Sequence, residues 1–300
     1  MNEKFQHSAE TLSLPETDGG DTGRAPSAGI TIYRHPWPVR LFHWVNVCCF
    51  IILLMSGLQI FNAYPRLHVG QIGYYDTPAV FEIASNRDVA NPRSWIAIDG
   101  REVLDTTGIL GEVRDEGIFG IQTIAFPPWA ILPQKAMDLH DGRGWHFLTL
   151  YFFAANLFAY LIYGIASGRF RRTLVPDRDQ LRASSIARDL WMHLRLKHAT
   201  GAEAERYNLL QKTSYILVLF LLLPSMVLTG MTMSPSFVAA FPWLIDMFAG
   251  RQTARLIHFI SASLLVGFVV IHIFQLFVAG FLNEMRSILT GWFRVPEKRK

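Results

Sequence analysis

The sequence predicts an all-α integral membrane protein, a bundle of four transmembrane helices with a large outer loop layer between the first and second helices. Three observations predict it. The 300 residues are 51% hydrophobic and 17% charged, which is too apolar for an ordinary soluble domain. Four apolar segments are long enough to span a bilayer as helices. Finally, the connections between these segments differ in the sign of their charge.

The four predicted spans cover about residues 41–61, 145–168, 213–231 and 255–280. Pro224 lies inside the third, where neighbouring groups of a membrane bundle can satisfy the carbonyl that a proline frees. Together with their connections, the spans form a domain predicted over residues 33–295. Residues 1–32 are polar and are predicted to be a disordered cytoplasmic tail, and residues 296–300 form a basic tail.

Charge predicts how the chain crosses the membrane. Residues 169–212 carry ten basic and five acidic side chains, and the C-terminal residues are basic. Residues 62–143, in contrast, carry eleven acidic and seven basic side chains. Because short basic connections stay in the cytoplasm, we expect both termini there and residues 62–143 outside. This distribution explains the net charge of +4, so membrane lipid and not nucleic acid is the predicted contact.

The outer connection, residues 62–143, is expected to form a packed extramembrane layer, because a structureless loop of this length is uncommon. Its apolar stretch at 117–133 contains Pro127, Pro128 and Pro133. These prolines argue against a further spanning helix and favour a segment on the membrane surface. Whether the layer is a lid over the bundle or a docking surface stays open.

Two histidines stand inside the fourth predicted span. His258 and His272 are separated by fourteen residues, which places them about 21 Å apart along a helix and within about 40° around it. A single buried histidine is explained by a hydrogen bond to a neighbouring helix. Two on one face, in a region that disfavours polar groups, favour metal or haem ligation if partner histidines exist.

The predicted topology supplies those partners. His43 begins the first span on the inner side, where His272 also lies, and His146 begins the second span on the outer side, near His258. A low-spin haem iron takes two axial imidazoles, so we predict an inner and an outer haem b. Zinc prefers three or four ligands in one compact set, and no CxxCH motif for covalent haem attachment occurs. His35 is the natural rival of His43.

With these features the sequence resembles the prokaryotic cytochrome b-561 superfamily, which includes the cytochrome b subunits of nickel-iron hydrogenases and formate dehydrogenases. The resemblance is carried by RLFHW around His43, RGWHF around His146, the fourteen-residue interval in the last span and RYNLLQK at 206–212. It extends from about residue 33 to the C-terminus. The resemblance implies the same haem pairing and a multi-pass protein of the bacterial inner membrane.

The resemblance also implies a quinone site, for menaquinone or ubiquinone, because the matching segment borders one in the formate dehydrogenase subunit. Asn208, Gln211 and Lys212 are then candidates to hydrogen-bond the quinone. Without the resemblance, such residues at a helix start are interpreted as capping or interfacial residues. Arg40 and Arg143 are candidates to neutralise haem propionates, or else interfacial anchors.

The expected function is electron transfer through two haem b groups between the quinone pool and a periplasmic redox partner, as the membrane subunit of an oxidoreductase. The outer loop and LPQKAMDLHDGRGWHF resemble members associated with periplasmic molybdopterin-dependent oxidoreductases. Two alternatives stay open. One is a stand-alone cytochrome b that exchanges electrons between a small oxidant such as superoxide and quinone. The other is a non-redox membrane anchor or transporter.

Overall fold

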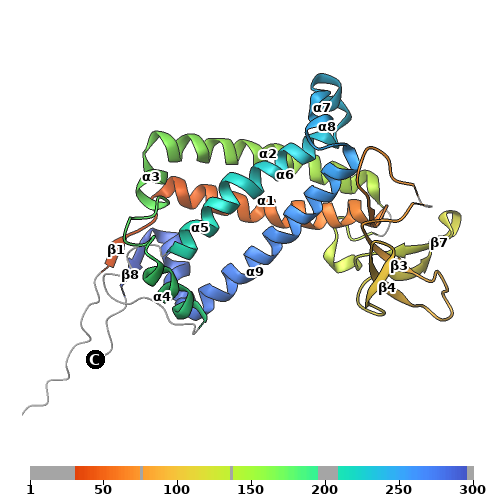
Figure 1. Ribbon diagram of the computed structural model, residues 1–300, viewed down its shortest axis with the longest axis horizontal. Helices are drawn as coiled ribbons and strands as arrows, with labels where there is room; N and C mark the ends of the chain where they lie inside the picture. Colours follow the sequence, from red (N-terminus) through yellow and green to blue (C-terminus); the bar gives the residue numbers. More distant parts are fainter. Residues whose placement is uncertain (1–30, 75–76, 136–137, 195–208, 296–300) are drawn as a thin grey trace, which may run out of the picture.

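The computed structural model describes residues 31–74, 77–135, 138–194 and 209–295. Four helical segments in it are long and apolar enough to cross a membrane, which confirms the predicted fold class. They are α1 (Trp37–Asn62), α2 (Leu139–Ala166), the segment Leu209–Thr232 and α9 (Arg251–Thr290). They form an elongated bundle with a β layer at one end and the two described chain ends at the other (Figure 1).

Two helices continue well beyond the predicted spans. α2 begins at Leu139, where the Asp138 side chain accepts a hydrogen bond from the backbone of Asp141 at 3.2 Å and caps the helix. α9 continues to Thr290 but contains Gly280 in a non-helical conformation, with φ 106° and ψ 80°. Apolar length predicts only the part of a helix in hydrocarbon, so the polar turns at 139–144 and 281–290 were missed.

The third span consists of three consecutive segments. α5 (Leu209–Leu217) leads into a π-helical turn, η4 (Val218–Leu222), and then into α6 (Leu223–Thr232). Pro224 is in the first turn of α6. Because proline lacks an N–H and its ring crowds the preceding turn, the wider π turn accommodates the irregularity expected at this residue.

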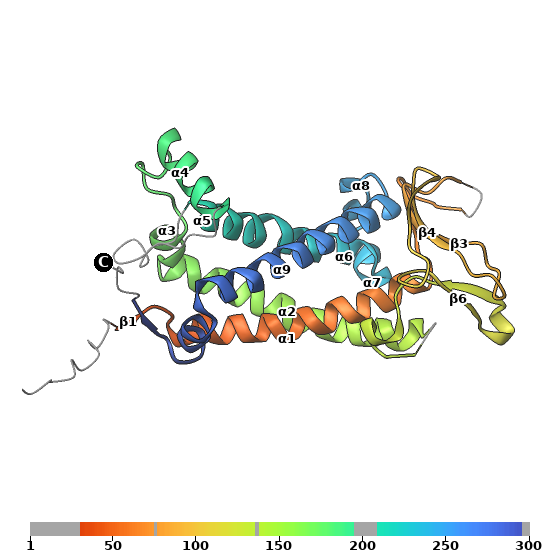
Figure 2. The same ribbon diagram turned by 90° about the horizontal axis from the view of Figure 1, so that it is seen from below.

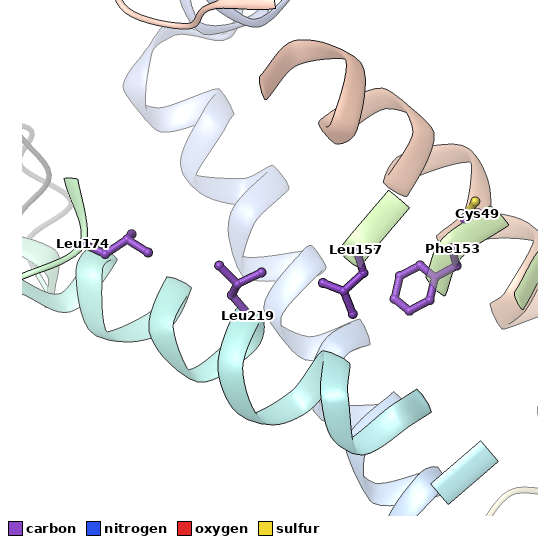
Figure 3. Close-up of a cluster of buried hydrophobic side chains, with 5 residues drawn as sticks. All are labelled: Cys49, Phe153, Leu157, Leu174 and Leu219. Atoms are coloured by element: carbon purple, nitrogen blue, oxygen red, sulfur yellow. The ribbon is translucent and has the colours of Figure 1, made fainter. Parts of the chain in front are cut away.

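The helices pack in two layers. α1 lies along α2, while α6 packs on α9, and Figure 2 shows these pairs one above the other. Between them lies a buried apolar cluster (Figure 3), formed by Cys49, Phe153, Leu157, Leu174 and Leu219. Within the first layer, Asn156 of α2 donates to the Asn46 side chain of α1 at 2.9 Å. Cys49 is thus a core residue with a free thiol.

At the inner end, the two described ends of the chain pair with each other. β1 (Thr31–Tyr33) and β8 (Trp292–Arg294) form an antiparallel two-stranded sheet. The short helix α3 (Arg169–Thr173) and α4 (Ala183–Leu194) belong to the basic connection beside it (Figure 1). Of the tail predicted at residues 1–32, residues 1–30 lie outside the described residues, as does the tail at 296–300. Thr31 and Ile32 belong to β1 and not to a disordered tail, because they pair with Arg294 and Phe293.

The outer layer is built from strands, which the sequence analysis did not predict. A four-stranded antiparallel sheet has the order β2-β3-β4-β5, with bounds Arg66–Leu67, Phe81–Ser85, Ser94–Ile98 and Arg101–Asp105. A hairpin follows, made of β6 (Glu112–Asp115) and β7 (Ile121–Ile124), with the short turns η1 (Gly117–Phe119) and η2 (Pro128–Ala130). Part of the segment expected to lie on the membrane surface is therefore strand β7.

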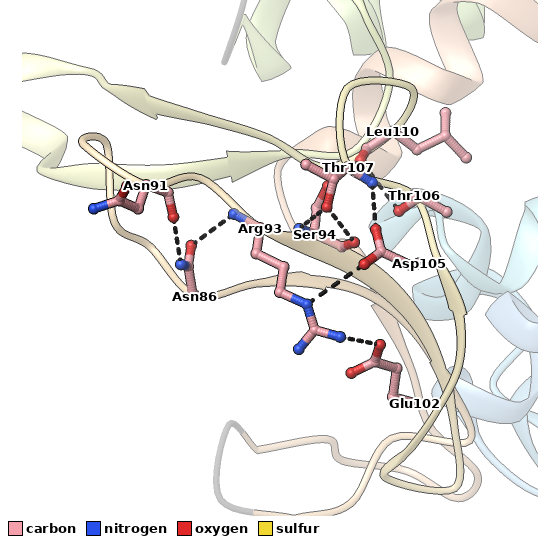
Figure 4. A network of polar contacts seen from close by, with 9 residues as sticks. All are labelled: Asn86, Asn91, Arg93, Ser94, Glu102, Asp105, Thr106, Thr107 and Leu110. Carbon is pink, nitrogen blue, oxygen red and sulfur yellow. Dashed lines mark hydrogen bonds and ion pairs between the residues drawn. The ribbon is translucent and has the colours of Figure 1, made fainter.

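Polar contacts hold the far part of this layer together (Figure 4). Arg93 forms ion pairs with Glu102 and Asp105 of β5. Hydrogen bonds from Thr107, aided by Arg93, lower the pKa of the Asp105 carboxyl group. On the near side, Phe61, Leu67 and the strand residue Ile83 join a cluster that contacts α9, and this cluster attaches the layer to the bundle. Two short helices, α7 (Pro235–Ala240) and α8 (Trp243–Met247), connect α6 to α9.

Candidate functional site

The structure brings His146 of α2 and His258 of α9 together, as the sequence predicted. Their ring centroids are 6.3 Å apart and the ring planes are inclined by 61°. A bond of about 2 Å from a metal to each imidazole nitrogen, plus about 1 Å from nitrogen to ring centre, separates two axial rings by about 6 Å. The two rings therefore have the spacing of two imidazoles on one metal ion.

Each of these rings is bonded to a buried hydroxyl group. The Nδ1 atom of His146 lies 3.0 Å from Ser56 Oγ, and that of His258 lies 2.9 Å from Thr229 Oγ1. Both hydroxyls donate their own proton to the carbonyl four residues earlier, at 2.6 Å in each case. The hydroxyl oxygens must then accept from Nδ1–H, which leaves the Nε2 lone pair of each ring available as a metal ligand.

The surroundings of the two rings are similar as well. A Cβ atom at Gly57 would lie 3.4 Å from Cε1 of His146, and one at Gly230 would lie 3.6 Å from Cε1 of His258. Each imidazole thus rests against a glycine of a neighbouring helix. In the described part of the chain, no group of three or more His, Cys, Asp or Glu side chains could hold a metal ion. This arrangement fits a group that needs two axial nitrogens.

At the inner end, His43 of α1 and His272 of α9 lie within electrostatic range of each other. The ring of His272 stacks on Phe268, with centroids 6.0 Å apart and planes inclined by 12°. Trp44 contacts His43 edge to face at 5.5 Å. The predicted inner pair is therefore at one level of the bundle, although no ring contact as close as that of the outer pair is formed.

His35 is close to this inner pair. Burial first, and then the charges of Arg34, Arg169, His43 and Arg40, lower its pKa from 6.5 to about 3. Its Nδ1 atom is buried and has no hydrogen-bond partner among the described residues. His35 is thus a neutral side chain beside the inner pair, and the choice of His43 over His35 as a ligand stays a prediction.

The two arginines predicted near propionates have different surroundings. Arg40 donates from Nη1 to the Leu289 carbonyl, and its buried Nε has no partner in the described ranges. Arg143 is exposed and lies over the Phe147 ring at 5.7 Å. Arg255 was not among the predicted site residues. It precedes His258 by one helical turn and donates to the carbonyls of Arg66 and Tyr64. In the sequence, Arg255 is recognisable as a charged residue at the start of an apolar span.

Of the quinone candidates, Asn208 lies outside the described residues. Gln211 is in the first turn of α5. Lys212 is 5% exposed, and its Nζ donates to the Val175 carbonyl at 3.0 Å and to Gln180 Oε1 at 2.9 Å. In this structure Lys212 holds the inner connection against the third span.

Comparisons with known proteins agree with this architecture. The chain is similar to a putative protein-methionine-sulfoxide reductase subunit, YedZ1, of Azospira oryzae, with 33% identity over 239 residues that cover 80% of this chain and 87% of the relative. No solved structure matches the chain. Residues 34–291 match the family described as prokaryotic cytochrome b561. That match includes all four spans and both histidine pairs, so the chain belongs to the prokaryotic cytochrome b561 family, whose members are membrane cytochromes with haem b.

Proposed function

We propose that this protein is a di-haem cytochrome b that transfers electrons across the inner membrane between the quinone pool and a periplasmic redox partner. The observation that carries the proposal is the outer histidine pair, with centroids 6.3 Å apart and both Nδ1 atoms bonded to hydroxyls. Because Nδ1 of each ring is bonded to a hydroxyl, Nε2 would be the atom that each ring offers to a haem iron. Haem b supplies reversible one-electron transfer at that iron.

The four histidines have defined tasks in this proposal. His146 and His258 hold the outer haem, and His43 and His272 hold the inner one. Because α9 contributes one ligand to each site, fourteen residues apart, it fixes the separation of the two irons. The apolar side chains around the sites exclude water, so that electrons and not ions cross the bundle.

The inner site would exchange electrons with a menaquinone or ubiquinone. Gln211 stands at the inner start of the third span, beside an apolar bundle that can receive an isoprenoid tail. Together with Asn208 and Lys212 it remains our candidate for binding the quinone head group. Both termini are placed in the cytoplasm by the charge of the connections, and the pairing of β1 with β8 supports placing the two ends on one side.

The outer partner would be a periplasmic molybdopterin-dependent oxidoreductase. The relative from Azospira oryzae is named as a subunit of a protein-methionine-sulfoxide reductase, which supports a subunit function for this chain also. The acidic outer layer, with exposed side chains such as Ile118 at 95% on its hairpin, is the surface available to that partner. Electrons would pass between the outer haem and the partner at this end.

A reduced-minus-oxidised absorption spectrum of the purified protein, together with its haem content, tests the proposal. We expect a b-type spectrum and two haems per chain. Replacing His258 with Ala should remove one haem and leave the other, whereas the matched variant His140→Ala, at an exposed histidine of α2, should retain both. Absence of a b-type signal, or retention of both haems in His258→Ala, would refute the proposal.

A further inference from the structure

Four buried polar atoms near the inner histidine pair have no hydrogen-bond partner among the described residues. They are Nδ1 of His35, Nε of Arg40, Nε1 of Trp44 and Oγ of Ser287. Two of them, the arginine and indole nitrogens, can only donate. Leaving a buried donor without an acceptor is unfavourable, so several of them in one region indicate a group that accepts hydrogen bonds.

Contacts with the end of α9 bring His35, Arg40 and Ser287 to one place. The His35 amide donates to the Gly291 carbonyl at 3.3 Å, and the Gly291 amide donates to the Ser287 carbonyl at 2.9 Å. The Arg40 guanidinium reaches the Leu289 carbonyl. The end of α9, beyond its kink at Gly280, is therefore held against the start of α1 (Figure 2).

Arg40 and Trp44 share one side of α1. Residues four apart on a helix differ by about 40° in direction and by about 6 Å along the axis. His43 lies between them in sequence, about 60° from Arg40 around the helix. Trp44 points about 100° away from His43 around the helix, but its ring contacts the His43 ring edge to face, with centroids 5.5 Å apart. Arg40 by its direction and Trp44 by this ring contact therefore both lie next to His43.

The charge in this region is positive. The positive charges of Arg34, Arg169 and Arg40 all act on His35, while Glu284 forms an ion pair with Arg34 at 3.6 Å. Within the described ranges, no ion pair is formed by Arg40 or Arg169. A negatively charged acceptor is therefore favoured over a neutral one such as a quinone carbonyl.

We propose that Arg40 Nε and Trp44 Nε1, with His35 and Ser287 beside them, form a binding site for a carboxylate, and that a propionate of the inner haem fills it. The proposal rests on the di-haem function and extends it to two further residues: Trp44, the last residue of the RLFHW motif, and Ser287, which lies in no motif named above. Arg40 supplies charge, and Trp44 supplies a directed donor next to the ligand His43.

The test compares Arg40→Gln and Trp44→Phe with the matched control Trp37→Phe, an exposed tryptophan of the same helix. The resonance Raman bands of propionate bending report hydrogen bonds to the carboxylate directly. We expect these bands to shift in Arg40→Gln and Trp44→Phe and to remain unchanged in Trp37→Phe. Arg40→Gln should also speed dissociation of the inner haem about ten- to a hundredfold, because a hydrogen bond to a charged group is lost.

Other outcomes have clear meanings. Unchanged propionate bands in Arg40→Gln and Trp44→Phe, with both haems bound, would overturn this inference and leave the di-haem proposal intact. The same holds if the bands are unchanged but a quinone-analogue inhibitor binds more weakly, since the donors would then face the quinone. Absence of an inner haem from the unmodified protein would instead refute the proposed function itself.

Discussion

The hydroxyl group of Thr229 accepts a hydrogen bond from Nδ1 of His258 at 2.9 Å while donating to the carbonyl of Ser225 at 2.6 Å. In the same way, the Ser56 hydroxyl of α1 accepts from Nδ1 of His146 and donates to the carbonyl of Ile52. These bonds fix the tautomer and the orientation of both rings. In metal sites, such partners of a ligating histidine typically change metal affinity by about 10–100-fold.

Replacing Thr229 with Val should therefore weaken retention of the outer haem about tenfold and raise its midpoint potential. The potential rises because an imidazole that loses an acceptor at Nδ1 is a weaker donor to ferric iron. Redox titration followed by absorption, with haem content after dialysis, measures both effects. Ser56→Ala should act in the same direction.

Ser263→Ala is the control for these hydroxyl variants. Ser263 is exposed and donates to the Phe259 carbonyl at 2.9 Å, without a histidine partner. A change of equal size in Ser263→Ala and Thr229→Val would show that the effect comes from the helix backbone and not from the bond to His258.

Gly280 permits the kink that brings the end of α9 to α1. Its φ of 106° is accessible to glycine and strained for other residues, and no atom lies within 4 Å of a Cβ placed there. Gly280→Ala should lower the free energy of unfolding by about 1–3 kcal/mol and reduce occupancy of the inner haem more than the outer. Thermal unfolding in detergent and haem content provide the measurements.

Gly267 offers a matched comparison for Gly280. It lies within regular α9, and a Cβ there also meets no atom within 4 Å. Since alanine favours a helix by about 1 kcal/mol over glycine, Gly267→Ala should be neutral or stabilising. Equal destabilisation by the two alanines would argue against a specific role of the kink.

A substitution of Lys212 tests whether this residue stabilises the fold or binds the quinone. Its two hydrogen bonds reach Val175 and Gln180, so Lys212→Met should destabilise the protein by about 1–3 kcal/mol and make the connection near Val175 easier to cleave. Limited proteolysis and thermal unfolding detect this, with Lys135→Met, at an 80% exposed side chain, as control. Weaker quinone binding at unchanged stability would instead assign Lys212 to the quinone.

His68 should make the outer layer sensitive to acid. It is 3% exposed and bonded to the Tyr64 hydroxyl at 3.0 Å, and burial, with the charge of Arg66, lowers its pKa below 6.5. The unfolded chain therefore binds more protons below pH 6.5. The neutral, buried His68 therefore costs no stability above pH 6.5. Below that pH the free energy of unfolding decreases, by up to about 1.4 kcal/mol per pH unit.

Unfolding curves of the unmodified protein and of His68→Asn between pH 7.5 and 5 measure this contribution, followed by tryptophan fluorescence. The difference between the two should shrink as the pH falls. A difference that stays constant over this range would mean that His68 does not titrate as its burial requires.

The proximity of the histidines within each pair was predictable, because position along a helix and topology determine which residues share a level of the bundle. That they bind haem stays a prediction. The hydroxyl partners of the histidines were not predictable. A serine or threonine in a membrane helix usually bonds to its own backbone, as Ser56 and Thr229 also do. Whether its oxygen also meets a histidine depends on how two helices are rotated, which sequence spacing does not contain.

The strands of the outer layer have one local signal in the sequence, at the turn between β4 and β5. Asp99 and Gly100, both with positive φ, form a two-residue turn between β4 and β5, and an Asp-Gly pair between apolar runs is a strong hairpin signal. The rest of the layer could not be predicted in this way, because β3 and its partners are connected by longer segments whose register depends on packing against Phe61 and Phe259.

The pairing of β1 with β8 closes the described chain into a ring on the inner side. A cut in the outer layer would therefore leave α1 tied to α9 through this sheet and through Arg40. The two fragments should stay associated and keep the inner histidine pair at one level. We therefore expect a protein whose outer layer can be interrupted without releasing the helices, because the β1–β8 sheet joins the two described ends of the chain.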